Sequence, residues 1–339
     1  MDSDEVDNVT SEIESRKPRI AVRPYAPTQA ELDEHLPLHV NYRSWCEHCV
    51  AGKGISHQHT RRADGEAPLG VTISVDYCFM VSEEVEEDMI PVLIAYDDSK
   101  KCMWALAVDS KGANEIAVKW MCDKLDSTGY RGVKITVKSY QEPSILAFKR
   151  AVAARRVAET ALIESPIRES KSNGQVERAV QTWQGQFRTL RHYIESRLNA
   201  KIPRDSAILQ WLVVWSSDVL TKYKVHANGR TSYEMITGHR CKHQIVSFGE
   251  RVHFKYAMDK NKRNKSESYW EIGYFLGIKE STTEYLVSID GSICSSATIR
   301  RMTDQEAYSE QCIESVKINY WNFISDGARS TKNTVVIFA

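Results

Sequence analysis

The clearest periodic pattern lies between residues 173 and 198, where apolar side chains recur at spacings of three and four residues. This spacing predicts one long amphipathic helix with a single apolar stripe. Glu177 lies one residue off the stripe, near the helix start, where a carboxylate can face a cleft instead of solvent. The stripe consists of Val176, Val180, Trp183, Phe187, Leu190, Ile194 and Leu198.

Shorter β-rich and amphipathic segments precede and follow this helix. Strands are predicted at 70–79, 91–97, 102–109, 133–137 and 161–163, and further helices at 113–127, 143–158 and 205–222. Gly129 is a natural C-cap, and Pro143 suits a first helical position. Three strands in a meander followed by alternating helix and strand predict a mixed α/β core.

The hydrophobic period changes after the core. Between Phe248 and Met302, short β-rich pieces alternate with glycines, which predicts a small all-β barrel. The first thirty residues are polar and acidic and then contain prolines, so they are predicted to be a disordered tail. The expected units are therefore a tail at 1–30, a His/Cys unit at 31–62, the α/β core at 68–240, the barrel at 245–305 and an unassigned segment at 306–339.

Asp76 lies inside the first predicted strand, in the run Val71–Phe79. A carboxylate in a buried strand is costly unless it is paired or binds a metal. Alone, Asp76 could simply cap a strand end, and Glu177 could be a solvated acid in a first helical turn. Taken together, one acid on a strand and one on a following helix indicate a site for divalent cations.

A second cluster has the spacing His35-x3-His39-x6-Cys46-x2-Cys49. Two imidazoles at helical spacing and a Cys-x2-Cys turn can surround Zn²⁺ tetrahedrally, so we expect a zinc knuckle. The alternative is a helix-turn with free thiols. His48, His57 and His59 are competing ligands, although we expect them on the surface or facing DNA. The remaining cysteines are widely spaced, which favours a reducing compartment and metal binding over a disulfide framework.

Composition restricts the partners. Lys plus Arg equals Asp plus Glu at 45 each, but eleven of the acids fall in residues 2–14 and 83–88. The remaining 34 acids face 45 bases, so the rest of the chain is net basic and suits a polyanionic partner. The apolar runs are too short to cross a bilayer, and the acidic N-terminus does not read as a secretory signal.

These features resemble the integrase region of copia-type retrotransposon polyproteins, over most of the chain from about His35 to about Met302. In that family a segment like Lys-Ser-Asp-Gln-Glu-Pro carries the second acid of an Asp, Asp, Glu triad; here it reads Lys138-Ser139-Tyr140-Gln141-Glu142-Pro143. The 36 residues from 141 to 176 then separate it from Glu177, close to the family interval. Gly273-Tyr274-Phe275-Leu276-Gly277 similarly matches a phrase of the family's C-terminal barrel.

The resemblance implies a ribonuclease-H-like integrase core in which Asp76 and Glu177 hold Mg²⁺ or Mn²⁺ for DNA integration by polynucleotidyl transfer. Tyr140 stands where the family has a metal-binding Asp, and a phenol with a pKa near 10 is a weak ligand for Mg²⁺. We therefore expect strand transfer to be lost or severely weakened, with Glu142 a poor rescue because the family already has a Glu there. The alternatives are a non-catalytic DNA-binding protein derived from an integrase, and an untranslated or unstable remnant of the element.

The resemblance also implies DNA as partner, a homo-oligomer on paired DNA ends, and a nuclear site of action or a cytoplasmic element particle. No reverse-transcriptase or protease signature is apparent, so the chain is expected to be one slice of a longer polyprotein. Basic side chains at the rim of the predicted barrel are the best candidates for phosphate contact, although a merely solubilising loop would look the same. These are Lys255, Lys260, Lys262, Arg263 and Lys265.

Overall fold

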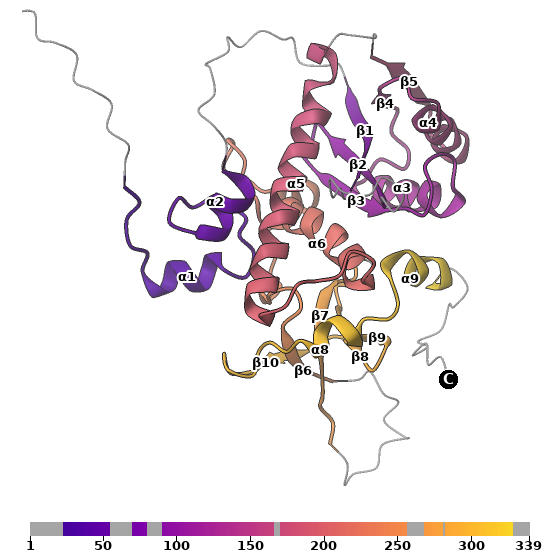
Figure 1. Cartoon of the computed structure of the whole chain (residues 1–339). Helices are drawn as coiled ribbons and strands as arrows, with labels where there is room; N and C mark the ends of the chain where they lie inside the picture. Colours follow the sequence, from indigo (N-terminus) through magenta and orange to yellow (C-terminus); the bar gives the residue numbers. More distant parts are fainter. Residues whose placement is uncertain are drawn as a thin grey trace, which may run out of the picture.

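The computed structural model describes residues 23–54, 70–79, 90–165, 170–255, 268–280 and 282–327. Within these ranges the chain forms a small helical unit, an α/β core and a second sheet (Figure 1). The long helix α5 (Ser170–Leu198) contacts both the helical unit and the core sheet, so it is the element on which these parts converge.

The core sheet has five strands in the order β3-β2-β1-β4-β5. The first three strands are antiparallel neighbours, whereas β4 runs parallel to β1 and β5 runs parallel to β4. This is the predicted meander followed by crossovers, and it confirms the mixed five-stranded core. The strands are β1 (Val71–Phe79), β2 (Pro91–Asp97), β3 (Met103–Ala107), β4 (Ile135–Ser139) and β5 (Thr160–Glu164).

Helices cover both faces of this sheet. Alternate residues of β1, including Ile73 and Val75, join the apolar cluster formed with α3 (Glu115–Ser127) and α4 (Pro143–Arg155). Cys78, of opposite parity, joins the cluster that contains the apolar stripe of α5 and much of α6 (Ala207–Tyr223). Because side chains alternate across a strand, Asp76 lies on the same face as Cys78, toward α5.

The element boundaries follow the predictions closely, with three informative differences. Strand β4 begins at Ile135, two residues later than predicted, and α4 ends at Arg155, three residues before its predicted end. Helix α1 (Gln29–His35) begins inside the range predicted as a tail, because Thr28 and Glu31 form a capping box at its start.

The second sheet is antiparallel, with five strands in the order β10-β6-β7-β8-β9. Gly273 is required in β7, because a Cβ there would lie 2.7 Å from the Ser288 carbonyl and overlap the Val287 side chain. The ladders of the described residues do not include a β9–β10 pairing, so the prediction of a closed barrel is confirmed only as an antiparallel sheet. The strands are β6 (Arg251–Phe254), β7 (Glu271–Ile278), β8 (Tyr285–Ile289), β9 (Ser292–Ser296) and β10 (Ile299–Arg301).

Three short helices complete the described chain: α7 (Ser232–Thr237), α8 (Gln311–Ser315) and α9 (Tyr320–Gly327). The last two lie in the segment that the sequence left unassigned. Trp321 is buried in the apolar cluster of α3 and α4, and the Trp211 indole of α6 donates to the Ile318 carbonyl at 2.8 Å. The segment therefore closes over the core and α6.

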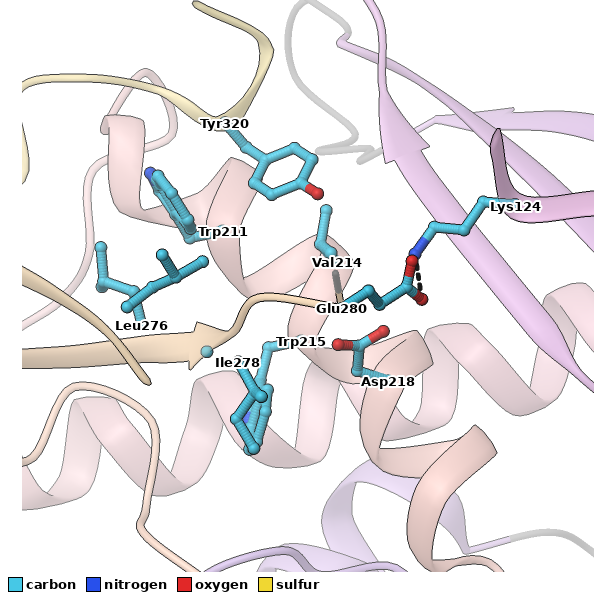
Figure 2. A pocket seen from close by; sticks show the side chains of 11 residues that line it. Lys124, Trp211, Val214, Trp215, Asp218, Leu276, Ile278, Glu280 and Tyr320 are labelled. Atoms are coloured by element: carbon cyan, nitrogen blue, oxygen red, sulfur yellow. Dashed lines mark hydrogen bonds and ion pairs between the residues drawn. The ribbon is translucent and has the colours of Figure 1, made fainter. Parts of the chain in front are cut away.

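The core and the second sheet meet at a small pocket of about 60 Å³ (Figure 2). Lys124 of α3 reaches Glu280, just past β7, at 2.6 Å, and Asp218 of α6 lines the same pocket. Burial opposes the charge on Lys124, but the Glu280 and Asp218 carboxylates raise the pKa of its ammonium group. An ion pair between the buried Lys124 and the exposed Glu280 carboxylate thus joins the two sheets.

Candidate functional site

The His/Cys residues predicted as zinc ligands come together between α1 and α2 (Glu47–Lys53). His35 is the last residue of α1, and His39 follows in a turn with φ of 48°. Cys46 is the N-cap of α2 and Cys49 lies in its first turn. One ligand atom from each of the four buried residues lies within 4.8 Å of all the others, so the group could hold a metal ion.

The separations between these atoms suit tetrahedral coordination. Cys46 Sγ lies 3.3 Å from His39 Nδ1, Cys49 Sγ lies 3.3 Å from His35 Nε2, and Cys49 Sγ lies 3.8 Å from His39 Nδ1. With Zn–S near 2.3 Å and Zn–N near 2.0 Å, a tetrahedron places its sulfur and nitrogen vertices about 3.5 Å apart. The four side chains therefore fit a zinc ion without rearrangement of the turn.

Their protonation also favours a metal. Burial lowers the pKa of His39 to about 4, although the hydrogen bond and charge of Cys46 act in the opposite direction. The lowered pKa keeps the His39 imidazole neutral. A hydrogen bond with Cys46 lowers the pKa of Cys49 to about 7, burial opposes this shift, and Lys53 adds to it. Neutral imidazole and thiolate are the forms that bind metal.

This knuckle is packed against α5, which the sequence did not indicate. The Gln186 amide donates to the Leu38 carbonyl at 2.7 Å, and the side chain of Gln186 is fully buried. His48 Nδ1 lies 2.6 Å from His192 Nδ1. The prediction that His48 lies on the surface is therefore wrong, because His48 is buried against α5; His57 and His59 lie outside the described residues.

One signal could have revealed this packing. Gln186 and Thr189 are polar, yet each directly precedes a residue of the apolar stripe, and both are completely buried. A buried polar side chain at the margin of an apolar stripe can indicate that a second element packs there, because the side chain needs a hydrogen-bond partner on that element.

The other six cysteines form no disulfide, and all but Cys241 are buried.

Asp76, inside β1, and Tyr140, directly after β4, are neighbours on two parallel strands. The register of β1 and β4 pairs Ser74 with Lys138, and two further residues along each strand lead to Asp76 and Tyr140. Neighbouring strands are about 4.8 Å apart. Tyr140 therefore stands beside Asp76.

Glu177 reaches the same place from α5. The Tyr140 hydroxyl donates a short hydrogen bond to Glu177 Oε1. Burial raises the pKa of Asp76 to about 6, and the carboxylates of Glu142 and Glu177 contribute, whereas the Tyr77 backbone N–H and Lys111 oppose the rise. The three positions therefore form one locus with two carboxylates and a neutral phenol.

Glu142 is engaged elsewhere at the rim of this locus. Lys111 Nζ lies 2.8 Å from Glu142 Oε1, and the Ser144 hydroxyl donates to the same oxygen at 2.7 Å. Among the described residues, only the His/Cys group brings three or more potential ligands close enough for a metal ion. The locus around Asp76 and Glu177 therefore does not form such a three-ligand group within the described residues.

The predicted DNA-contacting loop is described only at its start. Lys255 is exposed, with its ammonium 6.0 Å from the centre of the Tyr269 ring. Lys260, Lys262, Arg263 and Lys265 lie outside the described residues. Across the described residues, no helix combines the length and apolar character that a membrane span requires.

Comparison with known proteins gives distant likenesses. No family model matches the sequence, and neither does any curated protein. A chain of the simian T-cell lymphotropic virus intasome in complex with PP2A regulatory subunit B56 gamma is similar over 80% of this chain and 98% of its own, at 12% identity and a TM-score of 0.36. The HTLV-2 integrase catalytic core domain in complex with magnesium, in a trimeric form, is similar over 49% of this chain and 95% of its own, at 12% identity and a TM-score of 0.34. Because these identities and TM-scores are low, the description of the core as a mixed five-stranded α/β unit rests on its own strand order and pairing directions.

Proposed function

We propose that this chain is an integrase-like, nucleic-acid-binding protein of copia-type retrotransposon origin in which metal-dependent polynucleotidyl transfer is lost or strongly weakened. The observation that carries this proposal is the hydrogen bond from Tyr140 to Glu177, next to Asp76. It supports the proposal because Tyr140, Glu177 and Asp76, the positions that the resemblance assigns to the triad, lie close together with only two carboxylates among them.

Transfer of a DNA phosphodiester by two metal ions needs carboxylates that hold both ions about 4 Å apart. Here one carboxylate is occupied by a phenol that carries no charge at neutral pH, and the other takes up a proton more readily than usual. A loss of several kcal/mol of metal stabilisation corresponds to a thousandfold or larger loss of rate, at about 1.4 kcal/mol for each factor of ten. The arrangement therefore favours a non-catalytic DNA-binding role over full integrase activity.

The zinc knuckle has a structural role in this proposal. His35, His39, Cys46 and Cys49 would fill all four coordination positions, and a closed site of this type stabilises a fold instead of activating water. The unit between α1 and α2 has few buried apolar side chains, and one of them, Leu38, belongs to the apolar cluster of α5 and α6. Metal binding would supply much of the free energy that holds its turn together.

DNA contact is assigned to the net basic surface outside the acidic segments, with the loop from Lys255 to Lys265 as its first candidate. Such contact is independent of base sequence and weakens as salt rises. A homo-oligomer acting in the nucleus, or in a cytoplasmic element particle, follows from the same proposal.

The test compares Tyr140→Asp, Tyr140→Phe and the unaltered chain in joining a labelled oligonucleotide with Mg²⁺ or Mn²⁺. Aspartate restores a third carboxylate, whereas phenylalanine only removes the hydrogen bond to Glu177. We expect that only Tyr140→Asp joins the oligonucleotide, or that it does so at least a hundredfold faster than Tyr140→Phe and the unaltered chain. DNA binding, measured by fluorescence anisotropy, should be similar in all three.

Two results would contradict the proposal in different ways. Efficient joining by the unaltered chain would show that Tyr140 does not disable the site. Failure of all three proteins to bind DNA would overturn the assignment to nucleic acid.

A further inference from the structure

A second pocket lies between α5, α6 and the β2–β3 edge of the core sheet. Its volume is about 100 Å³, and its apolar floor is formed by Met103, Ala179 and Leu220. By the same measure a single water needs roughly 10–15 Å³. The pocket therefore has room for a group of several non-hydrogen atoms.

Cationic side chains from three separate elements line this pocket. Lys101 comes from the turn between β2 and β3, Arg178 from α5, and Lys224 from the C-cap of α6. His226 adds a fourth group that can carry a proton. Far-apart segments of the chain thus place like charges around one cavity.

This arrangement is costly without a counter-ion. Burial lowers the pKa of Lys224, and burial followed by the charges of Lys224 and Lys101 lowers the pKa of His226. Partly buried cations that repel one another are stabilised when an anion enters between them.

The acidic groups nearby neutralise only one of the three cations. Asp98 pairs with Lys101 at 2.8 Å and accepts a hydrogen bond from Gln175 at 3.0 Å. In the described part of the chain, neither Arg178 nor Lys224 forms an ion pair. Two positive charges are therefore left for a ligand.

His226 is oriented by its neighbours. The Ser232 hydroxyl donates its one hydrogen to the Lys101 carbonyl at 2.8 Å, so it accepts from His226 Nε2 at 2.9 Å. The Nε2 atom is therefore the protonated nitrogen of the neutral ring, and Nδ1 is left to take a second proton when an anion is present. The ring is held in place by backbone and side-chain contacts that do not involve the pocket's ligand.

We infer that this pocket binds a phosphate group through Arg178 and Lys224, with Lys101, paired with Asp98, at its edge. A planar guanidinium suits two oxygens of one phosphate, and ammonium groups supply point charges around the rest. The phosphate can come from a nucleic-acid backbone or from free phosphate. The inference rests on the proposed function only where it names nucleic acid as the source, since Arg178 directly follows Glu177 on α5.

Two substitutions test the pocket on the full chain. Lys224→Met replaces a desolvated ammonium with an apolar side chain of similar length, so it should not harm folding, and Arg178→Gln changes an exposed side chain. Arg204→Gln, which removes an exposed cation from the α5–α6 connection, is the matched control. Inorganic phosphate binding is measured by calorimetry, and single-stranded oligonucleotide binding by fluorescence anisotropy.

We expect each pocket substitution to weaken phosphate binding about tenfold or more, as for loss of one hydrogen bond to a charged group, while the control stays within about twofold. If the source is nucleic acid, the same two substitutions weaken oligonucleotide binding, and phosphate competes with the oligonucleotide. If the substitutions weaken phosphate binding but not oligonucleotide binding, the phosphate site is supported, and nucleic acid is ruled out as the source of the bound phosphate.

The two proposals can fail separately. Phosphate binding that is absent, or equal in Lys224→Met, Arg178→Gln and the control, would overturn the pocket. An oligonucleotide that never binds, with phosphate binding still sensitive to the pocket substitutions, would overturn the nucleic-acid function and leave the pocket intact.

Discussion

Gly52→Ala should loosen the packing of the knuckle on α5. Gly52 lies near the end of α2, directly against Thr189 of α5. A Cβ at Gly52 would lie 2.8 Å from the Thr189 backbone nitrogen and 2.9 Å from its Cα, with the hydroxyl oxygen closer still. A rotation of the Thr189 side chain would relieve only the hydroxyl contact, so the two helix backbones must move apart.

The magnitude follows from two opposing effects. Overpacking of a close contact costs about 1–3 kcal/mol, whereas alanine in place of glycine favours a helix by up to about 1 kcal/mol. The net loss is therefore up to about 2 kcal/mol, and it includes weakening of the Gln186 bond to the Leu38 carbonyl. Each kcal/mol lowers the Tm of a large domain by about 2–4 °C.

The assay combines thermal unfolding of the zinc-loaded protein with hydrogen exchange along the middle of α5. The control is Gly132→Ala, because a Cβ at Gly132 meets nothing within 4 Å. Gly52→Ala should lower the Tm by a few degrees and speed exchange in α5, while zinc content stays unchanged. A Tm equal to or above that of Gly132→Ala would refute the close packing of α2 on α5.

Three further predictions concern single side chains. Cys49→Ser should abolish stoichiometric zinc binding measured by atomic absorption, whereas Cys102→Ser, at a buried cysteine outside the knuckle, should retain the metal. Asp76→Asn should stabilise the protein in magnesium-free buffer. Because the pKa of Asp76 is raised to about 6, the folded state of the unaltered chain holds this proton more tightly than the unfolded state. The stability of the unaltered chain therefore falls as pH rises from about 4 to about 6. The gain, by urea unfolding, should reach up to about 3 kcal/mol above pH 6 and vanish near pH 4; a gain that does not change with pH would contradict the burial of that carboxylate. Lys124→Met should cost about 1 kcal/mol, because it removes the cation bound to the exposed Glu280 carboxylate, whereas Asp218 keeps its ion pair with Lys222. An unchanged urea midpoint would show that the pair does not join the two sheets.

Local periodicity determined most of the secondary structure. The apolar stripe from Val176 to Leu198 became α5, and the succession of β-rich runs became the five strands of the core sheet. The spacing from His35 to Cys49 likewise placed four potential ligands on two short adjoining helices and the turn after the first. Such features depend on residues close together in the chain, so the sequence alone can predict them.

Only the tertiary structure decided what these elements meet. The hydrogen bond from Tyr140 to Glu177, the packing of His48 on α5 and the closure of Trp321 over the core all join residues far apart in the chain. The cationic pocket of Arg178 and Lys224 has the same origin, since its members lie on separate elements. Contacts of this kind depend on strand register and on which helix faces which sheet, and the free energy that selects them is shared across the whole packed core and is not carried by any single segment.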